Sequence, residues 1–283
     1  MDVNFVQSAQ NGNVDAIMHI KELANESNNE ALNILEKLYY DGSNMTVSNG
    51  TIVFRDRTQL TKKFKNRDDL INVILPEDLE ELGESAFDSC YKLERVIFPA
   101  GLQVIGNWAF YSCTKLEDVS FPVDLQLIGN DAFQGCKGLK SLNFPDGIHC
   151  IGKATFKDCE GLISITLPDR LQVIDEETFA NCTNLYNVVF GSNVQEIKRS
   201  SFFNCASLSR LEFPNLLRKI GRGAFNGCIN LQEVTFSKNL HTIENGAFQD
   251  CPIQHISYYS DNERDLVKYF RNRWNEFVKT VRD

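Results

Sequence analysis

Nine cysteines are the residues of this sequence best suited to chemistry, since thiols can act as nucleophiles, metal ligands or disulfide partners. Cys150 stands alone, whereas the other eight recur every 23 residues. No Cys-x-x-Cys pair of the kind typical of metal sites occurs, and nine is an odd number for a closed disulfide framework. We therefore predict a buried structural row of reduced thiols, with functional thiols as the alternative. The eight regularly spaced residues are Cys90, Cys113, Cys136, Cys159, Cys182, Cys205, Cys228 and Cys251.

Other motifs that could carry catalysis or bind phosphate give a weaker signal than the cysteines. His149 and Cys150 are adjacent, but neighbours on an extended segment point to opposite faces and cannot easily share a proton. The stretch "GRGAFNG" at 221–227 has the wrong spacing for a phosphate-binding loop. Carboxylates are numerous, as in "PEDLEELGES", but no pair is singled out for acid–base work. We therefore expect no enzyme, no metal site and no cofactor.

The charge and hydropathy of the chain exclude further classes. A net charge of −9 over 283 residues argues against nucleic-acid binding, which needs a basic surface to release counterions from phosphates. No run of 18 or more apolar residues is present, so we expect no transmembrane helix. The first residues, "MDVNFVQSAQ", lack the basic and apolar regions of a signal peptide. On these grounds alone we expect a cytoplasmic protein.

The cysteine spacing belongs to a 23-residue repeat. Each copy places Phe three residues before the cysteine and, in seven copies, Leu three residues after it. Segments such as "LERVIF" alternate inward and outward residues, which predicts a short strand that the following proline ends. "LQVIG" predicts a second short extended piece, and "NWAFYSC" about one turn of helix. One such unit cannot bury its own apolar face, so the units must stack into a solenoid.

The pattern C-x-x-L-x-x-V-x-F-P-x-x-L-x-x-I-G-x-x-A-F-x-x-C closely resembles the BspA-like, Treponema-type leucine-rich repeat, over about residues 67–258. The resemblance implies an α/β repeat fold, a right-handed solenoid with short parallel strands on its concave side. Members are commonly surface or secreted proteins of bacteria and parasitic protists, linked to adhesion and to binding host or partner proteins. No leader or anchor is evident here, so the compartment stays open between cytoplasm, by sequence, and cell surface, by resemblance.

The solenoid needs caps, because its end coils would otherwise expose core. We expect an N-terminal helical segment (1–42), a cap region (43–66), the solenoid (67–258) and a C-terminal amphipathic capping helix (259–283). The N-terminal helices either cap the stack or bind a partner separately. The last helix either folds over the open end or docks elsewhere; its mixed charges make a membrane role unlikely. Its expected apolar face carries Leu266, Phe270, Trp274, Phe277 and Val281.

Residues that point outward from the predicted concave sheet vary while the repeat pattern does not. They suit a protein partner, host or extracellular, better than nucleic acid. We therefore expect a non-enzymatic protein-interaction or adhesion module. The alternatives are a structural protein that assembles through its terminal helices, and a solvated face with no ligand. The candidate contact residues are Arg95, Ile97, Asp118, Ser120, Ser141, Asn143, Ser164, Thr166, Tyr186, Asn187, Val189, Arg210 and Glu212, with Trp108 as a secondary candidate elsewhere.

Overall fold

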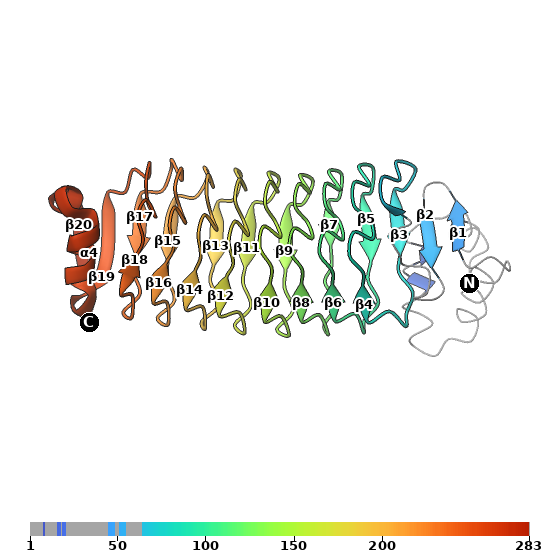
Figure 1. Cartoon of the computed structure of the whole chain (residues 1–283), viewed down its shortest axis with the longest axis horizontal. Helices are drawn as coiled ribbons and strands as arrows, with labels where there is room; N and C mark the ends of the chain where they lie inside the picture. Colours follow the sequence, from blue (N-terminus) through green and yellow to red (C-terminus); the bar gives the residue numbers. More distant parts are fainter. Residues whose placement is uncertain are drawn as a thin grey trace.

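Coils of 23 residues stack into a parallel-strand solenoid, which Figure 1 shows as a computed structural model. The structure describes residues 8, 16–17, 19–20, 45–48, 51–54 and 64–282. Each coil contributes one strand to each of two rows, and strands of successive coils lie side by side (Figure 1). The repeat in the sequence is thus a repeat in space, as the stacking argument predicts.

The first row contains the strands that follow the repeated leucine. Paired residues are 23 apart, as in Ser164 with Ser141, and the pairing is parallel. A tight turn ends each strand: the N–H of Leu102, for example, donates to the carbonyl of Pro99 at 3.2 Å. The strands are β3 (Asn72–Ile74), β5 (Arg95–Ile97), β7 (Asp118–Val119), β9 (Ser141–Asn143), β11 (Ser164–Thr166), β13 (Asn187–Val189), β15 (Arg210–Glu212), β17 (Glu233–Thr235) and β19 (His255–Tyr259).

The second row contains shorter strands, from the "LQVIG" segment of each coil. They are also parallel, and in each pair the inward isoleucine or leucine lies beside its equivalent, as Ile197 does beside Ile220. The strands are β4 (Glu81–Leu82), β6 (Val104–Ile105), β8 (Leu127–Ile128), β10 (Cys150–Ile151), β12 (Val173–Ile174), β14 (Glu196–Ile197), β16 (Lys219–Ile220) and β18 (Thr242–Ile243).

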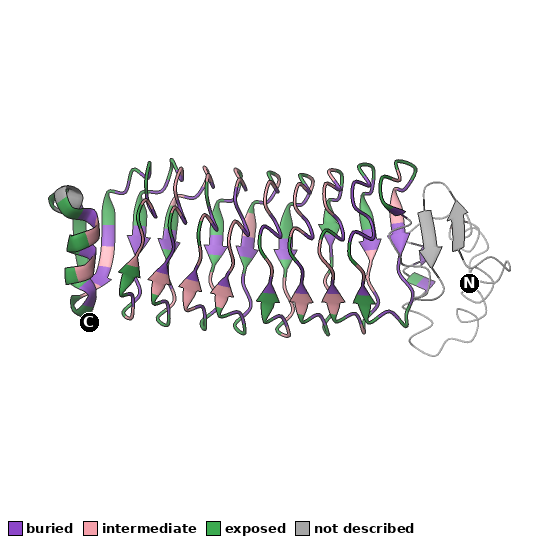
Figure 2. Ribbon diagram, in the orientation of Figure 1, coloured by how far each residue is buried: buried purple, intermediate pink, exposed green. Residues whose placement is uncertain are grey.

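Aromatic rings run through the core between the two rows. Nine phenylalanines, one per coil from Phe64 to Phe248, stack with ring centroids 5.1 to 5.7 Å apart. A second series, exemplified by Phe98, makes edge contacts with the first. Figure 2 shows the buried positions repeating from coil to coil along the stack. Each coil therefore depends on its neighbours for burial, as expected for a solenoid.

The eight regularly spaced cysteines form a buried row of free thiols. Each Sγ donates to the carbonyl of the phenylalanine 26 residues earlier, in the preceding coil, at 2.9 to 3.3 Å. Cys113, for example, donates to Phe87 at 3.2 Å. The thiol thus fills a small apolar space and also satisfies a buried carbonyl, which explains its repetition in structural terms.

The segment before each cysteine is not the turn of helix that we expected. Two residues per coil have positive φ, such as Trp108 (53°) and Ser112 (56°). With positive φ at these two positions, every second N–H of the segment points toward the next coil. The N–H of Phe110, for example, donates to the carbonyl of Ala132 at 2.7 Å. A helix would close these hydrogen bonds within its own turn. Stacking favours the arrangement that pairs them between coils instead.

The C-terminal end also differs from the single helix that we expected over 259–283. A 3-10 turn η3 (Ser260–Asn262) leads into α4 (Glu263–Phe270), followed by η4 (Arg271–Glu276) and a strand, β20 (Val278–Arg282). Leu266, Phe270 and Phe277 are buried as expected, but Val281 is 55% exposed. The prediction for Val281 was wrong because β20 adds to β19 as a parallel strand and continues the first row. The Trp274 side chain lies outside the described part of the structure.

Before the first complete coil, β1 (Met45–Ser48) and β2 (Thr51–Phe54) form an antiparallel pair, and β2 continues the first row beside β3. Most of the expected N-terminal helical segment lies outside the described residues. Within it, Ala16, Ile17 and Ile20 are helical and buried.

Candidate protein-binding groove

The sequence-predicted contact residues lie on the outward face of the first row, where their side chains point away from the core. The intervening residue of each strand points inward, as Val188 does at 7% exposure between Asn187 and Val189. Strand alternation therefore places these positions as expected. Most are exposed, while Ile97 and Ser164 are half-buried.

The predicted contact residues nearest the C-terminus line one groove on this face. Its volume is about 770 Å³, and it extends over β13, β15 and β17 to β19 and β20. Of the predicted residues, five line it: Tyr186, Asn187, Val189, Arg210 and Glu212. The structure thus concentrates the candidate site on a few neighbouring coils.

Exposed apolar side chains and aromatic rings line the groove together. Tyr186 is 60% exposed and Val189 48%, which is high for side chains of their size. Phe213, which belongs to the core, and Phe190, which is partly buried and packs against it, also line the groove. An aromatic residue beside an aliphatic one, near polar groups, is the composition of a protein-binding surface centre.

Charges in the groove are mixed and paired. Glu212 forms an ion pair with Arg210 of the same strand at 3.6 Å and accepts a hydrogen bond from Arg282 of β20 at 3.2 Å. Arg282 and Tyr259 also line the groove, and the sequence argument missed both. Arg282 was placed on a helix, although the alternating β-branched residues of "VKTVR" are a strand signal. Two arginines and one glutamate form a surface without the strong positive charge that nucleic acid requires.

The remaining candidates do not join the groove. The residues of β5 to β11 lie farther along the same face, from Arg95 to Thr166, and form an extended polar surface. Trp108, 39% exposed, lies on the turn segment. It lines a separate cavity of about 570 Å³ with Tyr111, Asp88 and Asp131.

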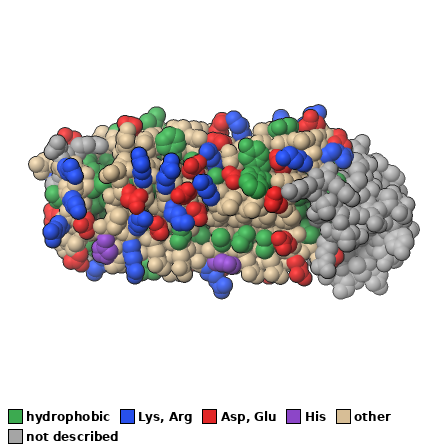
Figure 3. All heavy atoms as spheres, in the orientation of Figure 1, with side chains coloured by type: hydrophobic (Ala, Val, Ile, Leu, Met, Phe, Trp, Pro, Cys, Tyr) green, Lys and Arg blue, Asp and Glu red, His purple; other side chains and the backbone are tan. Residues whose placement is uncertain are grey.

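The residues that the sequence analysis considered for chemistry lie apart from one another in the part of the chain that the structure describes. No group of three or more His, Cys, Asp or Glu residues there could hold a metal ion. The His149 Nδ1 lies 3.5 Å from the Gly147 carbonyl, so its polar contact is with its own turn. Acidic and basic side chains instead pair between coils, as Lys157 does with Glu177 at 2.7 Å, and Figure 3 shows such charges interspersed over the C-terminal coils.

None of the described helices is long and apolar enough to span a bilayer.

The repeat pattern matches a known family model, described as a BspA type leucine-rich repeat region of six copies, over residues 58–163 and again over residues 149–273. These ranges cover more than half of the chain. The chain belongs to the BspA-type leucine-rich repeat family. The sequence-based resemblance is therefore confirmed. The family indicates a fold generally used for protein–protein interaction, and no enzymatic family is indicated.

Solved structures that are similar to this chain come from several bacteria. A leucine-rich repeat protein of T. pallidum is 26% identical, with a TM-score of 0.49, and the match covers 66% of this chain and 86% of that one. A leucine-rich cell surface protein of Faecalibacterium prausnitzii is 24% identical, covering 77% and 65%, with a TM-score of 0.49. A Bacteroides ovatus leucine-rich repeat protein is 19% identical, covering 86% and 100%, with a TM-score of 0.40. No curated protein matches the sequence.

Proposed function

We propose that this chain is a non-enzymatic interaction or adhesion module that binds a protein partner through the outward face of the first row. The observation that carries the proposal is the groove, where exposed Tyr186 and Val189 stand beside a paired set of charges. Tyrosine and arginine contribute most per residue at protein interfaces, and an aliphatic neighbour excludes water from such contacts. The overall charge of −9 favours a protein over nucleic acid as the partner.

Four of the five predicted groove residues stand on strands, which supports this assignment. Asn187, Val189, Arg210 and Glu212 project from β13 and β15, held by pairing between coils and by the aromatic core below. A preorganised surface loses little side-chain and backbone entropy on binding. The polar face over β5 to β11 would then form the rim of the interface.

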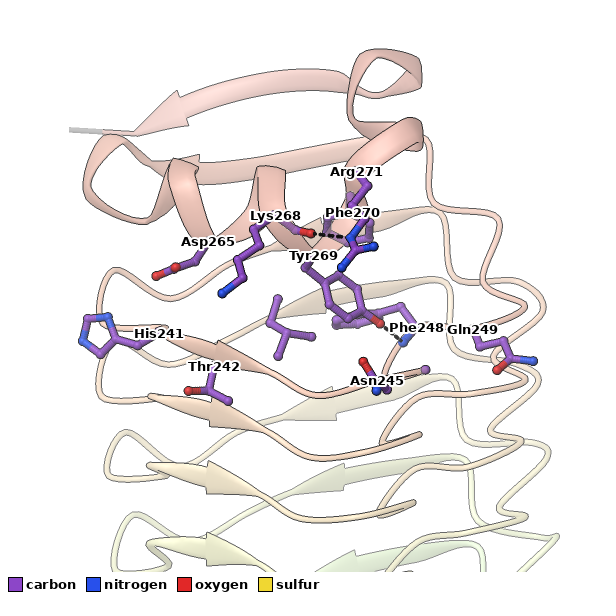
Figure 4. A pocket seen from close by; sticks show the side chains of 12 residues that line it. His241, Thr242, Asn245, Phe248, Gln249, Asp265, Lys268, Tyr269, Phe270 and Arg271 are labelled. Carbon is purple, nitrogen blue, oxygen red and sulfur yellow. Dashed lines mark hydrogen bonds between the residues drawn. The ribbon is translucent and has the colours of Figure 1, made fainter.

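Assembly through the C-terminal helix is less well supported. Leu266 and Phe270, the largest aliphatic and aromatic residues on the inner side of α4, are 1% and 8% exposed, and Phe270 packs on Phe248 of the last coil (Figure 4); Val267 is the one aliphatic residue of α4 that is exposed, at 38%. A helix whose apolar face is buried within its own chain has little left to offer a second copy.

The test compares two double variants of the intact protein as baits in extracts of its native cell. Tyr186→Asp with Val189→Asp places two charges in the groove. Tyr91→Asp with Val123→Asp makes the same changes at exposed positions outside it, which are 47% and 72% exposed. We expect the wild type and the control to retain the same partner and the groove variant to lose it. Equal retention by all three, with unchanged melting temperatures, would exclude the groove as the binding surface.

A further inference from the structure

The turn segments of neighbouring coils form a cavity of about 570 Å³ that lies apart from the groove of the first row. Two columns of equivalent repeat positions line it. Pairing between coils sets Trp108 next to Asp131, since the Trp108 N–H donates to the Asn130 carbonyl at 3.0 Å. The first column is Ser85, Trp108 and Asp131, the second is Lys65, Asp88, Tyr111 and Gln134, and Glu84 completes the lining.

Trp108 is an unusual residue for its place in the repeat. Its φ of 53° lies in the left-handed region, where later coils have Gly223 and Gly246 at the equivalent position. Its side chain is 39% exposed and therefore contributes little to the core. Tyr111, which is half-buried, adds a second ring to the same lining. Neither backbone preference nor burial explains a tryptophan here, and residues of this kind often mark a binding site.

Acids outnumber bases around these rings. The lining contains three carboxylates, of Glu84, Asp88 and Asp131, and one ammonium group, of Lys65. Asp88 has partners within the chain, because it pairs with Lys65 at 2.6 Å and accepts from the Ser89 hydroxyl at 2.8 Å. With Lys65 engaged in this way, the cavity presents negative charge beside two aromatic rings.

Asp131 is the acid of this cavity that burial affects most directly. Its side chain is half-buried, and the loss of water raises its pKa above the ordinary value of 3.8. Lys153 and Lys157 attract it only weakly, since they pair with Glu176 and Glu177 at 3.1 and 2.7 Å. Among the described residues no hydrogen bond or ion pair reaches the Asp131 carboxylate. A bound cation would therefore stabilise it.

We propose that this cavity binds an arginine side chain of a partner protein. The guanidinium stacks on the Trp108 ring, and its N–H groups donate to the Asp131 carboxylate beside that ring. Arginine fits better than lysine because a planar, weakly hydrated cation can stack on an aromatic face and bond a carboxylate with two parallel N–H groups. A neutral side chain would leave the carboxylate without a partner. This site does not depend on the function proposed for the groove.

Three capped tripeptides test the ligand. Each has glycine at both ends and arginine, citrulline or lysine in the centre; citrulline has nearly the shape of arginine but no charge. They are titrated into the intact, isotope-labelled protein, and the indole N–H signal of Trp108 is followed by NMR. The sequence contains two tryptophans, so this signal is assigned by its loss in Trp108→Asn.

We expect the arginine peptide to shift the Trp108 signal saturably and to bind about tenfold more tightly than the citrulline peptide. The lysine peptide should bind between the two. Equal binding of the arginine and citrulline peptides, or no saturable shift with arginine, would overturn the proposal. Lysine binding as tight as arginine would contradict recognition of a guanidinium.

The carboxylate is tested with Asp131→Asn, because asparagine tolerates the φ of 55° at this position, as Asn204 does at 57°. Asp250→Asn is the matched control, with a φ of 61° at an exposed site in the last coil. Binding is followed by the amide signals of Tyr111 and Gln134. We expect the arginine peptide to bind Asp131→Asn about tenfold more weakly than the wild type and to bind the control equally well. Unchanged affinity in Asp131→Asn would contradict the assignment.

The ring is tested independently with Trp108→Asn, which suits the same backbone conformation. Loss of the stacked ring should weaken binding of the arginine peptide about fivefold, and Trp108→Phe, which restores a smaller ring, should recover part of it. Melting temperatures show whether each variant is folded. A folded Trp108→Asn variant that binds the arginine peptide as tightly as the wild type would exclude stacking on this residue.

Discussion

At the scale of single residues, the cysteine row illustrates a packing role for a reactive side chain. A thiol is nearly as small and apolar as alanine, yet it can donate a weak hydrogen bond. Here it donates to the phenylalanine carbonyl of the preceding coil, as Cys182 does to Phe156 at 3.2 Å. Burial raises the pKa of the Cys90 thiol to about 11 and raises that of Cys136 well above its ordinary value. Since the thiolate is the reactive form, these residues should be inert.

Alkylation of the native protein measures this inertness. With iodoacetamide at pH 8 we expect one modified residue, Cys150, which is the only exposed cysteine. Its pKa is also raised, by desolvation and by Asp175, so it should react more slowly than free cysteine. In denaturant all nine thiols should react. Two or more modified cysteines per native molecule, located by peptide mass spectrometry, would contradict a buried structural row.

Trp108 occupies a backbone position that suits glycine. Its φ of 53° lies in the left-handed region, and Gly223 and Gly246 hold the same place in later coils. A non-glycine residue there costs about 1 kcal/mol, and glycine loses a similar amount in chain entropy. Trp108→Gly should therefore change the free energy of unfolding by less than about 1 kcal/mol. Trp108→Val should destabilise more, because β-branched residues rarely adopt this conformation. Equal effects in urea unfolding would argue against a conformational origin.

At the scale of elements, strands were easier to predict than the segments between and beyond them. In "LERVIF" apolar and polar residues alternate, and a proline follows. This pattern predicts β5 directly, because a strand places the alternate apolar side chains on one buried face. The turn segment depends on hydrogen bonds to other coils, which no local pattern encodes. The β-branched residues of "VKTVR" are a local strand signal, but the pairing of this strand with β19 is a tertiary contact. The prediction of one helix over 259–283 was wrong beyond Phe270, where α4 ends, because Val278–Arg282 pairs with the edge of β19 as a strand. Tertiary pairing there overrides a 3.6-residue periodicity.

Ion pairs between coils give a pH dependence that belongs to this scale. The side-chain hydrogen bond from Lys157 lowers the pKa of Glu177 below its ordinary value of 4.5. The pair therefore stabilises the fold above about pH 4.5, and this contribution is lost as the pH falls through the lowered folded-state pKa. Glu177→Gln should cost less than about 1 kcal/mol at pH 7, and this cost should shrink as the pH falls below about 4.5.

The control for this prediction is Glu160→Gln. Glu160 pairs with Lys137 at the same distance of 2.7 Å, but their side chains are 48% and 52% exposed, against 26% and 29% for Glu177 and Lys157. Solvent screens the exposed pair more strongly, so its variant should cost less at pH 7. A Glu177→Gln effect that is independent of pH in thermal melts would refute the ion-pair explanation.

At the scale of the whole molecule, each coil touches only its neighbours, so local damage should spread over a short distance. Phe156 is fully buried and stacks on Phe133 and Phe179 at 5.5 and 5.6 Å. Phe156→Ala should cost about 3–5 kcal/mol, whereas Val123→Ala at a 72% exposed site should be nearly neutral. Hydrogen exchange should show the largest loss of protection in the coils of Phe133, Phe156 and Phe179. A uniform loss along the chain would contradict nearest-neighbour stacking.

The candidate site could be predicted from the sequence only in part. The repeat register identified which side chains point outward, because strand alternation applies to every coil. It could not show that Tyr186, Val189 and Arg210 share a groove with Arg282, which bonds to Glu212 across 70 residues of sequence, since that depends on the unforeseen strand β20. Where a partner binds along the first row is therefore a property of the assembled solenoid.

The most direct test of the proposed binding surface is site-specific photocrosslinking. Benzoylphenylalanine replaces Tyr186 in the groove or, as a matched control, Tyr91 outside it; both tyrosines are exposed. Intact protein is irradiated in its native extract, and crosslinked species are identified by mass spectrometry. We predict a discrete protein adduct from position 186 that is missing from position 91. An adduct from position 91 with none from position 186 would contradict a partner-binding groove on the first row of strands.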